Sequence, residues 1–299
     1  MRMDKRLSNA INEILASYGK HPEIQGISRS TLPVKESIIA LAKDIQVLLF
    51  PGLLRQESLE PLDLPYIIGQ KTVSIFHRMR DYMEQVLCWD LMQGEGDCST
   101  NEDFTAKVRE IAMAFIEELP QMREVLAEDV EGIFGADPAA RSRREIVLAY
   151  PGIQALSIHR IAHFLYNKGI PLLPRIMSEY IHSETGIDIH PGAQLGKGTM
   201  IDHGTGIVIG ETAVIKNHVR LYQGVTLGAL NPTRNLDKLG SKRHPTIEDD
   251  VVIYAGATIL GGDTVIGKGA IIGGNVWLTH SIPPHSRIYL EKPMSSNIP

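Results

Sequence analysis

The chain has 299 residues, of which 22% are charged, and its formal net charge is −5 with a pI of about 6.1. This length is sufficient for one large domain or two ordinary domains with a buried core. A slightly acidic chain has no overall basic field for holding nucleic acid or an anionic membrane, so the expected partner is a small molecule.

The N-terminal segment contains no uninterrupted apolar stretch of the kind found in signal peptides. The most apolar early segment, residues 37–50, is interrupted by Lys43 and Asp44 and is too short to span a bilayer. Two cysteines, Cys88 and Cys98, are too few for a metal or disulfide framework, and Cys88 is interpreted as a buried helix residue. These features predict a cytoplasmic protein.

The first half of the sequence has the periodicity of helices. In residues 104–119, apolar side chains recur at i, i+3, i+4, i+7 and i+11, which places them in one stripe on a helix. The next segment repeats this pattern, and a further helix is predicted over 153–169, ended by Gly169 and Pro171. The sequence therefore predicts an all-α domain over residues 1–182.

Beyond this domain, an aliphatic residue returns about every six positions, and 17 of the 27 glycines fall between Gly186 and the C-terminus. A six-residue period fits a short strand and a tight turn, and such units stack into a parallel β-helix with coils about 4.8 Å apart. The period does not give the hand of the coil, and an antiparallel sandwich is the alternative. The predicted inward-facing residues are Ile189, Leu195, Ile201, Ile209, Ile215, Leu221, Leu227, Ile247, Ile253, Ile259, Ile266, Ile272 and Leu278.

Two departures from the six-residue period are places where a specific site can be built. In the first, the spacing between Ile201 and Ile209 is eight residues, and the extra length follows Asp202 and His203. The second is a protruding loop over residues 229–245. Its basic side chains would suit a phosphorylated ligand or simply face solvent.

His203 has a candidate partner in Asp188, which lies near the same edge one coil below. A carboxylate at that distance can hydrogen-bond an imidazole and raise the basicity of its other nitrogen, as a general base requires. The alternative is a surface histidine in a turn. Where the loop rejoins the wall, Arg243 can bind a carboxylate through two hydrogen bonds and His244 can add a donor.

Two further histidine pairs have spacings that a metal site can use. His159 and His163 share a helix face at i and i+4, but no third ligand is evident, so we interpret them as helix-surface or interface residues. His280 and His285 lie at the end of the repeats. No metal site is predicted.

The run DIHPGAQLGKGTMIDHGTGIVIGETAVI, followed by QGVTLGA, KRHPTIEDDVVIYAGATILGG and IPPHS, closely resembles the serine O-acetyltransferases. These are left-handed β-helix acyltransferases built from hexapeptide repeats. The resemblance covers about residues 135–288. It implies a left-handed β-helix domain over 183–299 after the helical domain, and transfer of an acetyl group from acetyl-CoA to L-serine in cysteine biosynthesis. Acetyl-CoA is then a co-substrate, and no cofactor is tightly bound.

The resemblance also assigns roles to individual residues. His203 is the general base, Asp188 orients it, and the serine hydroxyl attacks the thioester directly without an acyl-enzyme. Two acidic residues bind the substrate ammonium group, two basic residues bind its carboxylate, and four small residues line the groove for the pantetheine arm of CoA. These sets are Asp137 and Asp202; Arg243 and His244; and Gly228, Ala229, Ala255 and Gly274.

For partners, the resemblance implies a homotrimer with active sites between subunits, or a dimer of trimers, and feedback inhibition by L-cysteine. Many relatives end in an isoleucine that inserts into cysteine synthase. This chain ends in Ile298 and Pro299, and a terminal proline would misplace the carboxylate, so we do not expect that complex.

Other functions fit parts of the sequence. They are an acyltransferase for homoserine, a sugar or an antibiotic, a γ-type carbonic anhydrase with three histidines on zinc, and a non-catalytic scaffold. Asp137 and Asp202 opposite Arg243 favour an amino-acid acceptor, whereas the DHGTG motif and the helical half disfavour the anhydrase.

Overall fold

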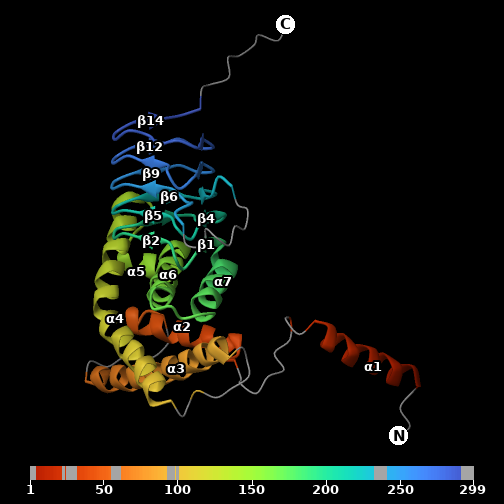
Figure 1. Ribbon diagram of the computed structural model, residues 1–299. Helices are drawn as coiled ribbons and strands as arrows, with labels where there is room; N and C mark the ends of the chain where they lie inside the picture. The colour runs from red at the N-terminus through yellow and green to blue at the C-terminus, as the bar shows by residue number, and fades with distance from the viewer. Residues whose placement is uncertain are drawn as a thin grey trace.

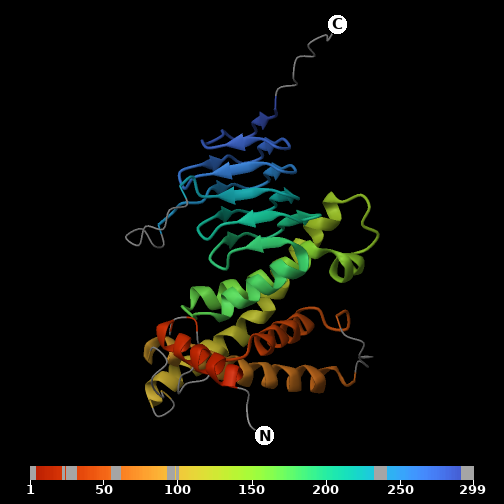
Figure 2. The ribbon, with the colours of Figure 1, turned by 90° about the vertical axis from the view of Figure 1, so that its right-hand side faces the viewer.

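The computed structural model describes residues 5–21, 24, 32–54, 62–92, 98, 101–231 and 241–290. In this part of the chain, seven helices precede fourteen short strands. The helices α2 to α7 form a layered half on which the strands stack as a column of coils (Figures 1 and 2). The predicted order, an all-α domain followed by a β-helix, is confirmed.

The helices are α1 (Lys5–Lys20), α2 (Lys35–Leu49), α3 (Leu64–Met92), α4 (Glu102–Ala136), α5 (Arg143–Ala149), α6 (Pro151–Asn167) and α7 (Leu173–Thr185). The two predicted segments after residue 103 form one helix, α4, which continues through Pro120 because its apolar stripe packs in the same core on both sides of the proline. The predicted helix over 153–169 is α6. The predicted division at residue 182 falls inside α7. Among the described helices, none is long and apolar enough to cross a membrane.

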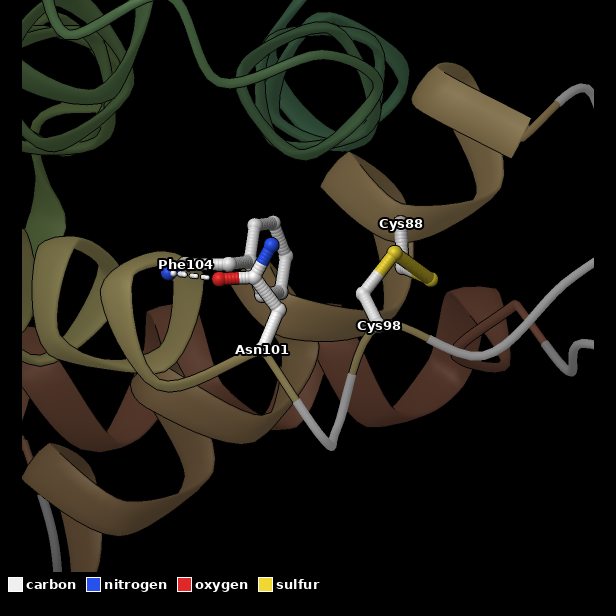
Figure 3. The surroundings of a disulfide bond; sticks show 4 residues. All are labelled: Cys88, Cys98, Asn101 and Phe104. Carbon is white, nitrogen blue, oxygen red and sulfur yellow. Dashed lines mark hydrogen bonds between the residues drawn. A yellow bond between two sulfur atoms is a disulfide. The ribbon is translucent and has the colours of Figure 1, made fainter.

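The two cysteines form a disulfide, and the sequence-based interpretation is wrong on this point. Cys88 in α3 and Cys98 before α4 are joined with their Cα atoms 5.7 Å apart (Figure 3). A single disulfide needs only two cysteines whose Cβ atoms face each other, which the number of cysteines in a sequence does not reveal. Cys88 is buried, as predicted. Beside the disulfide, the Asn101 side chain caps α4 by accepting a hydrogen bond from the Phe104 N–H.

The strands form three parallel sheets, one on each side of a triangular prism. Sheet A contains β1 (Ile187–Ile189), β4 (Ile207–Ile209), β7 (Thr226–Gly228), β10 (Thr258–Leu260) and β13 (Trp277–Leu278). Sheet B contains β2 (Gln194–Leu195), β5 (Val214–Ile215), β8 (Thr246–Ile247) and β11 (Val265–Ile266). Sheet C contains β3 (Met200–Asp202), β6 (Arg220–Tyr222), β9 (Val252–Ile253), β12 (Ile271–Ile272) and β14 (Arg287–Ile288).

Each coil runs from sheet A through sheet B to sheet C, and the strand register confirms the predicted inner column. In sheet A, Ile189 pairs with Ile209, which pairs with Leu227 one coil higher. Apart from Leu195, which is partly buried, every residue predicted to face inward is buried. Each such side chain contributes about 1.5–3 kcal/mol by leaving water. Because the described strand pairs are parallel, the antiparallel sandwich is excluded.

The helical half docks closely on the first coil through α4 and α6. A Cβ on Gly152, at the start of α6, would overlap the carbonyl oxygen of Ile201 in β3. A Cβ on Gly132 in α4 would lie 2.8 Å from the carbonyl oxygen of Gly198. Glycine at these two positions therefore permits the backbones to approach, and it places the start of α6 beside the end of β3.

A buried ion pair fixes the same junction. Asp129 in α4 is fully buried, accepts a hydrogen bond from the Thr199 N–H at 2.9 Å and pairs with Arg160 in α6 at 2.6 Å. Arg160 also donates to the carbonyls of Leu195 and Gly196. Burial raises the pKa of Asp129 to about 6, although Arg160 acts in the opposite direction. Two helices and the first coil thus share one network.

Candidate active site

The predicted site residues lie along two edges of sheet A. In each coil the chain enters sheet A from sheet C at one edge, called here the C–A edge, and leaves it for sheet B at the other, the A–B edge. The C–A edge carries Asp202, His203, Ala255 and Gly274, and the A–B edge carries Gly228, Ala229, Arg243 and His244. One side of the prism is roughly 10–20 Å wide at about 3.3 Å per residue, so the two sets are separated within one chain.

The turn from β3 to β4 presents His203 to solvent. His203 has a φ of 55°, and Gly204 and Gly206 follow with φ of 82° and 81°. The Asp202 carboxylate accepts a hydrogen bond from the His203 N–H at 2.8 Å, which stabilises this left-handed turn. The imidazole is 69% exposed. The bulge predicted from the eight-residue spacing is therefore confirmed.

Asp188 does not reach His203 in the single chain. It lies in β1 and pairs in the ladder with Val208 of β4, and within the described part of the chain it forms no hydrogen bond or ion pair with the imidazole. Instead, His203 Nε2 lies 3.7 Å from an Asp202 carboxylate oxygen. The pairing of Asp188 with His203 stays a prediction.

The helical half adds a second acidic group to this edge. Asp137 follows α4, and its carboxylate accepts hydrogen bonds from the Tyr150 hydroxyl at 2.6 Å and from the Ala139 N–H at 2.8 Å. The hydrogen bond from Tyr150 is the main reason that the pKa of Asp137 lies below its usual value, and nearby His203 contributes. The same bond raises the pKa of Tyr150 to about 12, with a smaller effect from Asp202. Asp137, Asp202 and His203 therefore form one cluster.

An aromatic pair lies above this cluster. Tyr222 in β6 is the ladder partner of Asp202, one coil higher. Its ring stacks on Tyr254 with the centroids 5.1 Å apart and the planes 13° from parallel. Burial raises the pKa of Tyr222, and the negative charges of Asp202 and Asp137 act in the same direction. The acidic cluster therefore has an apolar wall on one side.

A second cluster surrounds Arg243 at the A–B edge. Its guanidinium forms an ion pair with Glu211, and the Tyr166 hydroxyl donates to the same carboxylate at 2.6 Å. Burial acts to raise the pKa of Glu211, but the hydrogen bonds from Tyr166 and Arg243 outweigh it and hold the pKa below its usual value. The Arg243 N–H also donates to the Thr212 hydroxyl at 2.9 Å. This network holds the guanidinium at the surface, where it is 38% exposed.

His244 is a neutral group in this cluster. It is 8% exposed, and its Nδ1 accepts a hydrogen bond from the Thr212 N–H at 3.0 Å. Burial lowers its pKa to about 4, and the charge of Arg243 acts in the same direction. With Nδ1 as acceptor, the ring proton is assigned to Nε2. His244 can therefore donate a hydrogen bond near pH 7 but carries no charge.

The small residues predicted to line a CoA groove also fall on both edges. Gly228 ends β7 and Ala229 follows it, whereas Ala255 and Gly274 follow β9 and β12. A Cβ on Gly274 would lie 3.1 Å from the Ala255 carbonyl oxygen, so these two residues stack tightly in consecutive coils. Of the loop over 229–245, residues 232–240 lie outside the described residues, as do Ile298 and Pro299.

The two histidines of α6 have structural positions. His159 is buried between α6 and the first coil, and His163 Nδ1 lies 2.7 Å from the Pro191 carbonyl oxygen, so both are interface residues rather than surface residues. Burial lowers the pKa of His159 well below its usual value. Nowhere in the described ranges do three His, Cys, Asp or Glu side chains gather into a metal-binding group.

Comparison with known proteins decides the family. No family model matches the chain. The plasmid serine acetyltransferase of Synechococcus elongatus is 45% identical over 272 residues, which cover 89% of this chain and 84% of that protein. The serine acetyltransferase of Bacillus subtilis is 46% identical over 164 residues, or 55% of this chain and 72% of that protein. The chain belongs to the serine acetyltransferase family.

Solved structures of this family have the same fold. Serine acetyltransferase 1 of Entamoeba histolytica, crystallised with L-cysteine, gives a TM-score of 0.71 at 31% identity over 91% of this chain and 95% of that chain. The serine acetyltransferase of Neisseria gonorrhoeae, in complex with serine, gives 0.55 at 28% identity over 88% and 97%. These comparisons confirm the predicted fold class and the sequence resemblance.

Several residues of the two clusters were missed by the sequence analysis. Glu211 and Thr212 follow β4 in the GET motif. They lie one coil below Arg243 and His244 at the same edge, and this position in the repeat is the signal that could have found them. The three tyrosines, Tyr150, Tyr166 and Tyr222, gave no comparable signal. Tyr150 and Tyr166 reach the site only because α6 docks against the first coil.

Proposed function

We propose that the chain transfers the acetyl group of acetyl-CoA to the hydroxyl of L-serine, giving O-acetyl-L-serine and CoA for cysteine biosynthesis. The observation that carries this proposal is the charge layout of sheet A. A candidate base and two carboxylates line one edge, and a guanidinium with a neutral donor lines the other. A zwitterionic acceptor with a hydroxyl group needs carboxylates for its ammonium group, a base for its hydroxyl group and a guanidinium for its carboxylate. The names and ligands of the relatives agree with it.

The proposed site is shared between subunits. L-Serine is too small to contact His203 and Arg243 of the same chain across sheet A. If sheet A of each of three subunits faces a threefold axis parallel to the prism, the C–A edge of one subunit meets the A–B edge of the next. We therefore propose a homotrimer as the active unit. A dimer of trimers through the helical half is compatible with this site and adds no residue to it.

In the proposed mechanism, His203 accepts the proton of the serine hydroxyl as the oxygen attacks the thioester carbonyl. The C–O bond forms, the C–S bond breaks, and the resulting imidazolium returns the proton to the CoA thiolate. Asp188 or Asp202 stabilises the charged imidazole. No acyl-enzyme is formed.

Substrate contacts follow from the charges of the two edges. Asp137 and Asp202 bind the ammonium group of L-serine. Arg243 of the next subunit pairs with the carboxylate, and His244 donates from Nε2 to the same group. L-Cysteine has the same ammonium and carboxylate groups, so we propose that it inhibits by occupying this pocket, as the L-cysteine complex of the Entamoeba histolytica enzyme suggests for the family.

The pantetheine arm of acetyl-CoA is proposed to lie between adjacent prisms, against Gly228 and Ala229 of one subunit and Ala255 and Gly274 of the other. Small side chains permit a thin arm to approach the wall. A backbone N–H in this groove can stabilise the tetrahedral oxyanion by roughly 3–4 kcal/mol. Because acetyl-CoA is an intracellular metabolite, we propose a cytoplasmic location.

The test is thiol release from acetyl-CoA by the purified chain with L-serine, L-homoserine or a sugar offered separately. We expect release with L-serine and little with the other acceptors. No release with L-serine would contradict the proposal. Faster release with homoserine or a sugar would favour a different hydroxyl acceptor on the same fold.

A further inference from the structure

We propose that Tyr150 is a positioning residue that orients the Asp137 carboxylate toward the ammonium group of the acceptor. This inference rests on the proposed function, because it concerns the same acceptor pocket. It adds a specific task for the helical half: the residue between α5 and α6 keeps the acidic side chain that follows α4 in one orientation beside the C–A edge.

The carboxylate of Asp137 is held at both of its oxygens. The Tyr150 hydroxyl donates to Oδ2 at 2.6 Å, and the Ala139 N–H donates to Oδ1 at 2.8 Å. Asp137 lies just beyond the end of α4, where a partly exposed side chain with only one backbone contact can rotate about χ1 and χ2. The Tyr150 hydroxyl removes that freedom and leaves the remaining lone pairs of the carboxylate for a cation.

The position of Tyr150 is in turn fixed by the docking of the helices. Its N–H donates to the Ile146 carbonyl at the end of α5, and the residue itself precedes the first turn of α6. Two residues later, Gly152 packs directly on the Ile201 carbonyl of β3. Asp202 and His203 follow Ile201 in the chain. The contact at Gly152 therefore holds the Tyr150 hydroxyl at a fixed position relative to the end of β3, where the candidate base lies.

The charges fit this role over the pH range in which the enzyme would work. Because the hydrogen bond to Asp137 raises the pKa of Tyr150 to about 12, the hydroxyl stays protonated and remains a donor. The pKa of Asp137 is held below its usual value, mainly by the same bond, so its carboxylate stays ionised. An ionised, oriented carboxylate beside Asp202 is the arrangement that a primary ammonium group requires.

The experiment is steady-state kinetics of Tyr150→Phe, which removes only the hydroxyl. We expect the KM for L-serine to rise about three- to tenfold, the size of the effect of one ordinary hydrogen bond, because the hydroxyl acts on the substrate only through Asp137, with kcat and the KM for acetyl-CoA unchanged. The matched control is Tyr82→Phe. Tyr82 is a partly buried tyrosine of α3 whose hydroxyl has no hydrogen bond in the described structure, and we expect wild-type kinetics.

A double variant tests whether Tyr150 acts through Asp137. Asp137→Asn should raise the KM for L-serine by itself, and adding Tyr150→Phe should raise it no further, because the oriented charge is already lost. Multiplied effects of the two substitutions would show that Tyr150 acts independently of Asp137 and would overturn the inference.

The outcomes separate this inference from the proposed function. If the wild-type chain does not acetylate L-serine, the proposed function itself fails. If the wild type is active and Tyr150→Phe keeps the wild-type KM for L-serine, only the positioning role is wrong. A variant with a lower melting temperature, a lower kcat and a raised KM for both substrates would assign Tyr150 a merely structural role, which also overturns the inference.

Discussion

His203 and Arg243 lie at opposite edges of the same five-stranded sheet, sheet A, in one chain. His203 occupies the turn that enters the sheet, and Arg243 lies at the end of the loop that leaves it. With the roles proposed above, a base and a carboxylate-binding group separated in this way cannot act on one small acceptor within a monomer. This separation is the reason for proposing an active unit that brings the edges of two subunits together.

Single substitutions at the two edges should have different kinetic effects. His203→Ala should lower kcat at least roughly a hundredfold, because the general base is lost. Arg243→Ala should chiefly raise the KM for L-serine, because it removes binding of the acceptor carboxylate. Initial rates over a matrix of both substrates measure this. Near-normal turnover of His203→Ala, or an effect of Arg243→Ala confined to CoA, would contradict the assignments.

Co-expression of the two variants should restore activity. In randomly mixed trimers, about a quarter of the sites combine an intact His203 with an intact Arg243 of the next subunit. We therefore expect about a quarter of the wild-type rate at low serine concentration, above either variant alone. His203→Ala mixed with Asp137→Asn is the matched control, since both residues belong to the C–A edge and no site is intact. Equal rates in the two mixtures would exclude a shared site.

Gly152→Ala should separate the helical half from the prism edge. Its methyl group would overlap the Ile201 carbonyl, so α6 has to shift away and carry Tyr150 with it. We expect a lower melting temperature and a higher KM for L-serine. Gly69→Ala in α3 is the control: no atom lies within 4 Å of its added Cβ, and alanine favours the helix by up to about 1 kcal/mol. Equal thermal unfolding of the two variants would show that the close approach is not needed.

The pH dependence of stability should contain a contribution from His244. Its pKa is about 4 in the folded chain and about 6.5 when unfolded, so the folded state binds fewer protons between these values. The stability from keeping the ring neutral is present above pH 6.5 and is lost as the pH falls toward 4. Between these pH values, His244→Gln should lose less stability than the wild type in denaturant titrations. A parallel pH dependence of the two proteins would contradict the assignment.

The disulfide should contribute to stability without contributing to catalysis. It closes a loop between residues separated by 10 positions, for which chain entropy gives roughly 2–3 kcal/mol. A reductant should lower the melting temperature of the wild type but not that of Cys98→Ser, and the kinetics of both should be equal. An intact mass that is the same with and without reductant would show that the bond does not form. In a reducing cytoplasm the thiol form would prevail.

The sequence by itself determined the two halves and the inner column of the β-helix. Periodicity is a local property: a stripe at 3.6 residues or an aliphatic residue at six can be recognised without knowing any distant contact. The eight-residue spacing after Ile201 located the turn at His203 for the same reason. The motif resemblance then supplied roles for its neighbours, which periodicity alone left open.

The tertiary structure decided which residues that are distant in the sequence lie in contact. Cys88 and Cys98 pair because their Cα atoms lie 5.7 Å apart in the folded chain, which a count of cysteines does not reveal. Tyr150 meets Asp137 because α6 docks on β3 at Gly152, and His244 becomes a neutral donor because the coil buries it against Thr212. Above all, the sequence placed His203 and Arg243 in one site, and the three-sided coil places them on two edges. That separation arises because each strand carries the chain across one full side of the prism before the next turn.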